Sequence, residues 1–184
     1  NMILDKKIPK YINILKGLSE REKIIGALCN LQRKVICVEK FDKYYNENLS
    51  SDFRASLDRL VNYLSGASID LEDVKKTAML GPDSDDYPET EGSIAQNAFG
   101  ALYYLCKYIS SKNDMDLFQS LDKSFESTDA LKYDEGTQEE EDEYFGEEAT
   151  NLELLIEKVK QSPTESIENI KDLMVFAQQK SIKI

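Results

Sequence analysis

The chain has 184 residues, of which 41% are hydrophobic and 32% charged, proportions typical of a soluble globular protein. Its 35 acidic and 23 basic residues give a net charge of −12, which argues against nucleic acid or an anionic membrane surface as a partner. Histidine is absent, and this excludes Ser-His-Asp and Cys-His catalysis, His-based zinc sites and the Glu-x-x-His di-iron motif.

Apolar residues at helical spacing predict a short first helix over residues 8–16. Ser19, with a glutamate three residues later, forms a capping box that begins the next helix. Residues 35–38 are β-branched in part and resemble a strand, but no second strand is available to pair with them. We therefore expect one helix that continues to Tyr45 and bends near Arg33.

Ser51 or Asp52 is predicted to cap the N-terminus of the next helix, which ends before Gly66, a natural residue after a helix C-terminus. A shorter helix begins at Asp70. Residues 81–92 contain five acids, two prolines and no basic residue, and we expect them to form an acidic loop.

Residues Ser93–Ser110 are predicted to form the central helix of the protein. Nearly the whole helical circumference of this segment is apolar, whereas a surface helix has a single apolar stripe. A helix of this kind is buried by neighbours on several sides. We therefore expect the rest of the chain to pack around it.

The C-terminal third contains a second acidic stretch and a second helix-start motif. Residues 134–148 hold nine acids and no basic residue; we expect an acidic loop whose last part begins a helix. Residues 162–165, Ser-Pro-Thr-Glu, are typical of the first turn of a last helix. Together the elements predict a single all-α domain over residues 1–184, with seven or eight helices and no sheet.

The cysteine and targeting signals favour a cytoplasmic protein. Cys29, Cys37 and Cys106 are odd in number and lie among apolar helical residues, so we expect buried, reduced thiols. No apolar run is long enough for a transmembrane helix, and no signal peptide is evident.

Short motifs occur at four places along the chain. They are Leu18-Ser19 with Ala27-Leu28-Cys29 and Arg33; Leu57 to Leu64 with Gly66; Pro82-x-x-Asp85-Asp86-Tyr87 with Ala95, Ala98 and Ala101-Leu102; and Lys180-Ser181-Ile182-Lys183-Ile184. Together they resemble the YjaG-like family of bacterial proteins (domain of unknown function 416). The resemblance implies a compact all-helical fold and no established activity.

The chain also departs from the pattern of that family. Val61-Asn62-Tyr63 stands where the family has a tryptophan, and residues 34–37 replace its Pro-Asn-Tyr helix break. Lys183 stands where a glycine is usual.

The acidic stretches are the candidate functional feature, because residues 83–184 carry 24 acidic and 9 basic residues, a net charge of −15. Such a surface favours a cationic protein partner. We expect the binding residues to be the acids Asp83, Asp85, Asp86, Glu139, Glu140, Glu141, Asp142 and Glu143.

A divalent metal is the alternative occupant of these acids. The Asp83-x-Asp85 start resembles a Ca²⁺ loop, but that loop requires glycine at its sixth position, where Pro88 stands. The acids from Glu139 onward are consecutive, so they point all around a helix instead of facing inward at fixed spacing. No Gly-x-Gly-x-x-Gly or Walker A phosphate-binding pattern occurs. We therefore assign no catalytic residue and expect no metal or cofactor.

These observations favour a non-enzymatic, acidic protein-binding module. Its sharpest form is an immunity protein or antitoxin that neutralises a cationic toxin, because nuclease toxins present basic surfaces to phosphate backbones. Two alternatives stay open: a carboxylate- and Mg²⁺-dependent all-α hydrolase acting on nucleotides, and a housekeeping homodimer.

Overall fold

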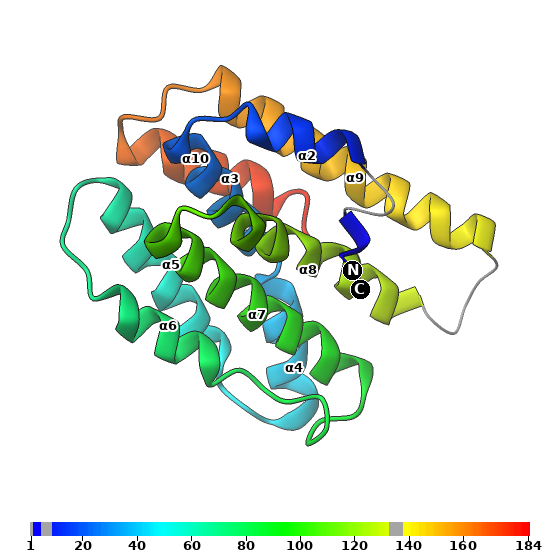
Figure 1. The fold of residues 1–184 in the computed structure, drawn as a ribbon. Helices are drawn as coiled ribbons and strands as arrows, with labels where there is room; N and C mark the ends of the chain where they lie inside the picture. Colours follow the sequence, from blue (N-terminus) through cyan, green and yellow to red (C-terminus); the bar gives the residue numbers. More distant parts are fainter. Residues whose placement is uncertain (1, 5–8, 133–137) are drawn as a thin grey trace.

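The computed structural model describes residues 2–4, 9–132 and 138–184, and within these ranges it contains helices and no strand. The helices are α2 (Pro9–Lys16), α3 (Glu20–Gln32), α4 (Val35–Tyr45), α5 (Ser50–Leu64), α6 (Leu71–Met79), α7 (Thr90–Ser111), α8 (Asp114–Lys132), α9 (Gln138–Gln161) and α10 (Ile167–Gln178). Figure 1 shows their arrangement. The all-α prediction is confirmed. None of these helices combines the length and apolar character needed to cross a membrane.

Helix α7 is the central element, as predicted. It packs against α3, α4, α6 and α8, and in Figure 1 it runs through the middle of the molecule. Ala101, Leu102 and Cys106, which point in directions up to about 140° apart around the helix, are completely buried. Burial on several sides explains why so little of its circumference is polar.

Three predicted helix signals are confirmed. Ser19 forms the capping box of α3, with its hydroxyl accepting from the backbone N–H of Glu22. Asp70 caps α6 by accepting from the N–H of Asp73. Gly66 has a φ of +95° just beyond α5, a conformation that glycine adopts without steric cost.

The prediction of one helix through Tyr45 is corrected to two, α3 and α4. The break lies at Arg33 and Lys34, between Gln32 and Val35. The carbonyl of Arg33 turns away from the helix to accept from the backbone N–H of Ile182, 3.1 Å away in the C-terminal segment. This bond comes from 149 positions further along the chain, so no local pattern indicates it.

Two predicted helix starts are wrong. Helix α5 begins at Ser50, earlier than expected, because the Asp42 carboxylate on α4 accepts from the N–H groups of Leu49 and Ser50, each at 2.8 Å. Helix α10 begins at Ile167 with Ser166 as its N-cap. Residues 162–165 precede it, and Ser162 instead bonds back to the last turn of α9.

The predicted acidic loop at 134–148 does begin a helix in its last part, but the helix starts earlier than expected. Residues 138–148 belong to α9, while residues 133–137 lie outside the described ranges. Phe145 and Glu148 are buried, and the Phe145 ring packs 6.1 Å from that of Phe125 on α8. These contacts hold the start of α9 against α8.

The other predicted acidic loop, residues 81–92, is a loop as far as Glu89, and its last three residues form the first turn of α7.

The three cysteines are free and buried, as expected from their apolar neighbours. Burial raises the pKa of the Cys29 and Cys106 thiols to about 12 and that of Cys37 to about 11. They therefore lack the thiolate character that a reactive cysteine requires.

Candidate functional site

The first group of predicted binding residues, Asp83, Asp85 and Asp86, lies exposed in the loop between α6 and α7. Asp83 organises a tight turn: its carboxylate accepts from the N–H of Asp85 at 2.9 Å, and its carbonyl accepts from the N–H groups of Asp86 and Tyr87 at 3.0 Å. The turn fixes the backbone and leaves the other two carboxylates facing solvent.

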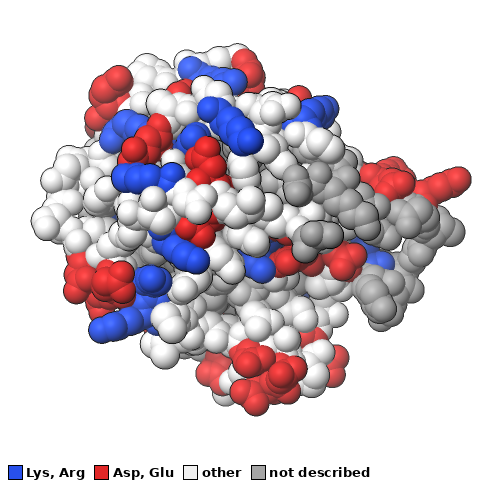
Figure 2. All heavy atoms as spheres, viewed as in Figure 1, with Lys and Arg blue, Asp and Glu red and all other residues white. Residues whose placement is uncertain are grey.

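The second group, residues 139–143, forms the first turns of α9. The side chains of Glu139, Glu140, Asp142 and Glu143 are exposed, and that of Glu141 lies outside the described side chains. In Figure 2 the acids over the start of α9, at the right, and those over the α6–α7 loop, at the bottom, form two separate patches. The fold thus does not bring the predicted residues into one surface.

Within the described residues, no group of three or more Cys, Asp and Glu side chains is placed to hold a metal ion. The acids of the α6–α7 loop are therefore not arranged as a set of converging oxygen ligands. The metal-dependent hydrolase gains no support from this part of the chain.

A cluster of aromatic rings lies beside the α6–α7 loop and was not recognised in the sequence. Tyr45 and Tyr87 stack edge-to-face at 4.8 Å, and each also contacts the buried ring of Phe41 at 5.0 and 4.9 Å. Tyr44 packs on Tyr45 at 4.8 Å and is 56% exposed. The rings come from α4 and from the loop, so only the fold brings them together.

Carboxylates surround these rings. The Tyr87 hydroxyl donates to Glu47 at 3.5 Å, and the Tyr45 hydroxyl accepts from the N–H of Glu89 at 3.3 Å. The charge of Glu89, with a smaller effect of Glu91, raises the pKa of Tyr44. We call this surface the tyrosine–carboxylate patch: Tyr44, Tyr45, Tyr87, Glu47, Asp86, Glu89 and Glu91.

The chemistry of the patch suits a cation. Aromatic faces attract ammonium and guanidinium groups, and adjacent carboxylates add ionic attraction. The neighbouring pair Tyr44-Tyr45 was visible in the sequence, but its proximity to the acidic loop was not. Asp86 belongs both to the predicted residues and to this patch.

A buried ion pair joins three distant parts of the chain. Arg33, at the end of α3, is fully buried and binds both carboxylate oxygens of Glu148 on α9, at 2.6 and 2.8 Å. The same guanidinium donates to Asn30 at 2.9 Å and to the carbonyl of Lys180 at 2.7 Å. Asn30 in turn bonds Ser124 on α8. Arg33 therefore ties α3, α9 and the C-terminal segment together.

Lys34, the next residue, is also fully buried but has a different environment. Its Nζ has no hydrogen-bond partner among the described residues. Burial lowers the pKa of Lys34 from 10.5 to about 8, partly offset by nearby Cys37 and Glu148. At neutral pH the side chain still carries its proton, because the pH is below this pKa.

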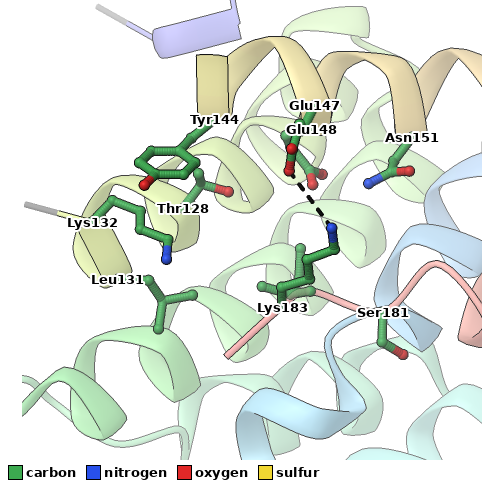
Figure 3. A pocket seen from close by; sticks show the side chains of 10 residues that line it. Thr128, Leu131, Lys132, Tyr144, Glu147, Glu148, Asn151, Ser181 and Lys183 are labelled. Atoms are coloured by element: carbon green, nitrogen blue, oxygen red, sulfur yellow. Dashed lines mark ion pairs between the residues drawn. The ribbon is translucent and has the colours of Figure 1, made fainter. Parts of the chain in front are cut away.

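A pocket of about 260 Å³ lies next to the Arg33–Glu148 ion pair, between α8, α9 and the C-terminal segment (Figure 3). Glu148 is part of its wall, and Lys183 points toward Glu147 with an Nζ–Oε2 distance of 3.8 Å. The other lining residues are Thr128, Leu131, Lys132, Tyr144, Asn151, Ser181 and Ile182.

No protein-family model matches the chain, and no curated protein matches it. Among solved structures, a DUF416 family protein from Shewanella baltica OS155 superimposes with a TM-score of 0.79 and 17% sequence identity. The match covers 95% of this chain and 98% of that chain. At this identity the likeness shows the fold, which does not by itself imply an activity. The motif resemblance is thereby confirmed at the level of architecture: the chain has the all-α fold of a DUF416 family protein.

Proposed function

We propose that this chain is a non-enzymatic, acidic protein-binding module whose partner is a cationic protein. The tyrosine–carboxylate patch is the observation that carries the proposal. It combines the exposed ring of Tyr44 and the half-buried rings of Tyr45 and Tyr87 with carboxylates on one surface, a combination that suits lysine and arginine side chains.

The aromatic rings distinguish this surface from an acidic loop that serves only solubility. A loop that only keeps the protein soluble does not require an exposed aromatic side chain beside it, yet Tyr44 on α4 is 56% exposed. A cation above such a ring gains about 0.5–1 kcal/mol at an exposed site, and a charge-assisted bond to a carboxylate adds to this. Tyrosine and arginine are also frequent among the residues that contribute most to protein interfaces.

The acidic start of α9 has a supporting role in this proposal. Glu139, Glu140, Asp142 and Glu143 extend the negative field beyond the patch. A field of this sign accelerates the approach of a basic protein, and the effect weakens as salt increases. In its sharpest form the proposal makes the chain an immunity protein or antitoxin for a nucleic-acid-binding toxin, since such a toxin presents a basic surface.

The test is a pull-down from cells of the native host, followed by titration of the purified partner at several salt concentrations. The double variant Tyr44→Ala/Glu89→Gln removes the centre of the patch. Glu165→Gln/Asp172→Asn removes two acidic charges, one more than the patch variant, from exposed positions in and before α10 and is the control for loss of charge. We expect a basic partner that the control retains and the patch variant loses.

A second variant, with the acids of 139–143 changed to their amides, separates steering from contact. We expect slower association and a weaker salt dependence, with a smaller change in dissociation rate. The proposal fails if no basic protein is captured. It also fails if the patch variant and the control bind the partner equally well.

A further inference from the structure

The buried basic pair Arg33-Lys34 is electrostatically unbalanced. Arg33 is neutralised by its two bonds to Glu148, but Lys34 has no hydrogen-bond partner among the described residues. Of the other groups whose charge acts on Lys34, Cys37 is a buried thiol and Glu126 binds Lys123 at 2.6 Å. One positive charge is thus left in the interior, where an uncompensated charge is costly.

Two residues that line the pocket of Figure 3, Glu148 and Ile182, also lie close to the Arg33-Lys34 segment, although Lys34 does not itself line the pocket. Glu148 lines the pocket and acts electrostatically on Lys34. Ile182 lines the pocket, bonds the carbonyl of Arg33 through its N–H, and packs in one apolar cluster with Cys37. The pocket and the buried charge therefore share the same few residues.

The rest of the wall offers donors. The side chain of Lys183 is 85% exposed and forms a long ion pair with Glu147, so its ammonium can turn toward a ligand. Lys132 lies with its Nζ 4.9 Å from the centre of the Tyr144 ring. The Asn151 amide is a further donor, whereas the Thr128 and Ser181 hydroxyls already donate to the carbonyls of Ser124 and Gln178 and offer a ligand no hydrogen.

We propose that this pocket binds a small oxyanion of the carboxylate or phosphate class, whose charge compensates the unpaired ammonium of Lys34. The volume of about 260 Å³ is near the lower end for ligand sites, so the occupant is a small molecule. The site is independent of the tyrosine–carboxylate patch, because it takes an anion and lies between α8, α9 and the C-terminal segment.

Thermal unfolding in added succinate, inorganic phosphate or chloride, at pH 7 and matched ionic strength, tests the proposal. We expect a saturable rise in melting temperature with succinate, phosphate or both, and none with chloride, because a ligand that binds only the folded state stabilises it. A response to phosphate alone assigns the phosphate class, and a response to succinate alone assigns the carboxylate class.

Lys34→Met is the decisive variant, with exposed Lys76→Met as its control. We expect Lys34→Met to melt at a higher temperature without ligand, because it removes an unpaired buried charge, and to lose the oxyanion response. Lys183→Gln, at an exposed position that does not endanger folding, should weaken the apparent affinity about fivefold.

Three outcomes would overturn the proposal. One is the absence of a saturable shift with either oxyanion in the unmodified protein. The others are an equal shift with chloride and an undiminished response in Lys34→Met. If Lys34→Met does not fold, an unchanged affinity in Lys183→Gln overturns it.

Discussion

Adjacent residues of the same charge have opposite energetic roles at the α3–α4 break. Arg33 and Lys34 are both completely buried, yet in the part of the chain that the structure describes Arg33 has hydrogen-bond acceptors and Lys34 has none. The planar guanidinium matches a carboxylate through two parallel bonds, which a lysine ammonium cannot do. The cost of a buried charge thus depends on the geometry available to each side chain.

The first residue-scale prediction concerns Glu148→Gln. This change leaves Arg33 buried beside Lys34 without its counter-charge, so we expect the free energy of unfolding to fall by about 3–5 kcal/mol. Urea denaturation measures it. Glu147→Gln, whose partner Lys183 is exposed, is the control and should change stability by less than about 1 kcal/mol. Equal effects of the two variants would show that the Arg33–Glu148 pair is not a major stabilising contact.

The second residue-scale prediction concerns pH. The pKa of Lys34 is lowered to about 8 in the folded protein, below its ordinary value of 10.5, so the unfolded chain binds more protons between these values. The contribution of Lys34 to the free energy of unfolding therefore rises as the pH increases from about 8 to 10.5, and it is least favourable below pH 8. Arg33, Cys37, Glu148 and Glu126 are the groups whose charges act on Lys34.

Comparison of the unmodified protein with Lys34→Met isolates the effect. The raised pKa values of the three thiols act in the opposite direction from about pH 9 upward. Those of Cys29 and Cys106 are common to both proteins, whereas the charge of Lys34 lowers the pKa of Cys37 in the unmodified protein alone, so the Cys37 effect only adds to the expected change. We expect the stability advantage of Lys34→Met to shrink between pH 7.5 and 9.5, measured by urea denaturation. A stability advantage of Lys34→Met that stays constant over this range would show that the pKa of Lys34 is not lowered into it.

At the scale of single helices, caps from other helices decide where some helices begin. The N-terminus of α5 is capped by Asp42 from α4, whereas Ser51, an expected cap, bonds only the carbonyl of Asn48 at 3.4 Å. We expect Asp42→Ala to cost about 1–2 kcal/mol, the usual value of a cap, and Ser51→Ala to cost a few tenths. Guanidinium denaturation of both variants tests this. A larger loss of stability in Ser51→Ala than in Asp42→Ala would show that Ser51 is the cap of α5, as the sequence predicts.

At the scale of the whole molecule, α7 holds the helices together. Leu102 is completely buried where α7 meets its neighbours, so Leu102→Ala should lower the free energy of unfolding by about 2–5 kcal/mol through lost burial and a cavity. Leu80→Ala is the control, because Leu80 is 76% exposed beyond α6. Calorimetry of both variants measures the difference, and a Leu102→Ala cost no larger than that of Leu80→Ala would show that α7 is not the centre of the core.

The helices themselves, the central position of α7 and the caps at Ser19 and Asp70 follow from the sequence alone. Helical periodicity and capping depend on residues within a few positions of one another, so the information is local. Gly66 belongs to the same class, because its positive φ is a property of one residue.

The break at Arg33-Lys34, the Asp42 cap, the tyrosine–carboxylate patch and the pocket were decided only by the tertiary structure. Each depends on a partner far away in sequence: Ile182 bonds the carbonyl of Arg33, Glu148 neutralises its side chain, and Tyr87 meets the rings of α4. No sequence pattern marks such partners, because packing of whole helices determines which distant side chains come within hydrogen-bond or ring-contact distance.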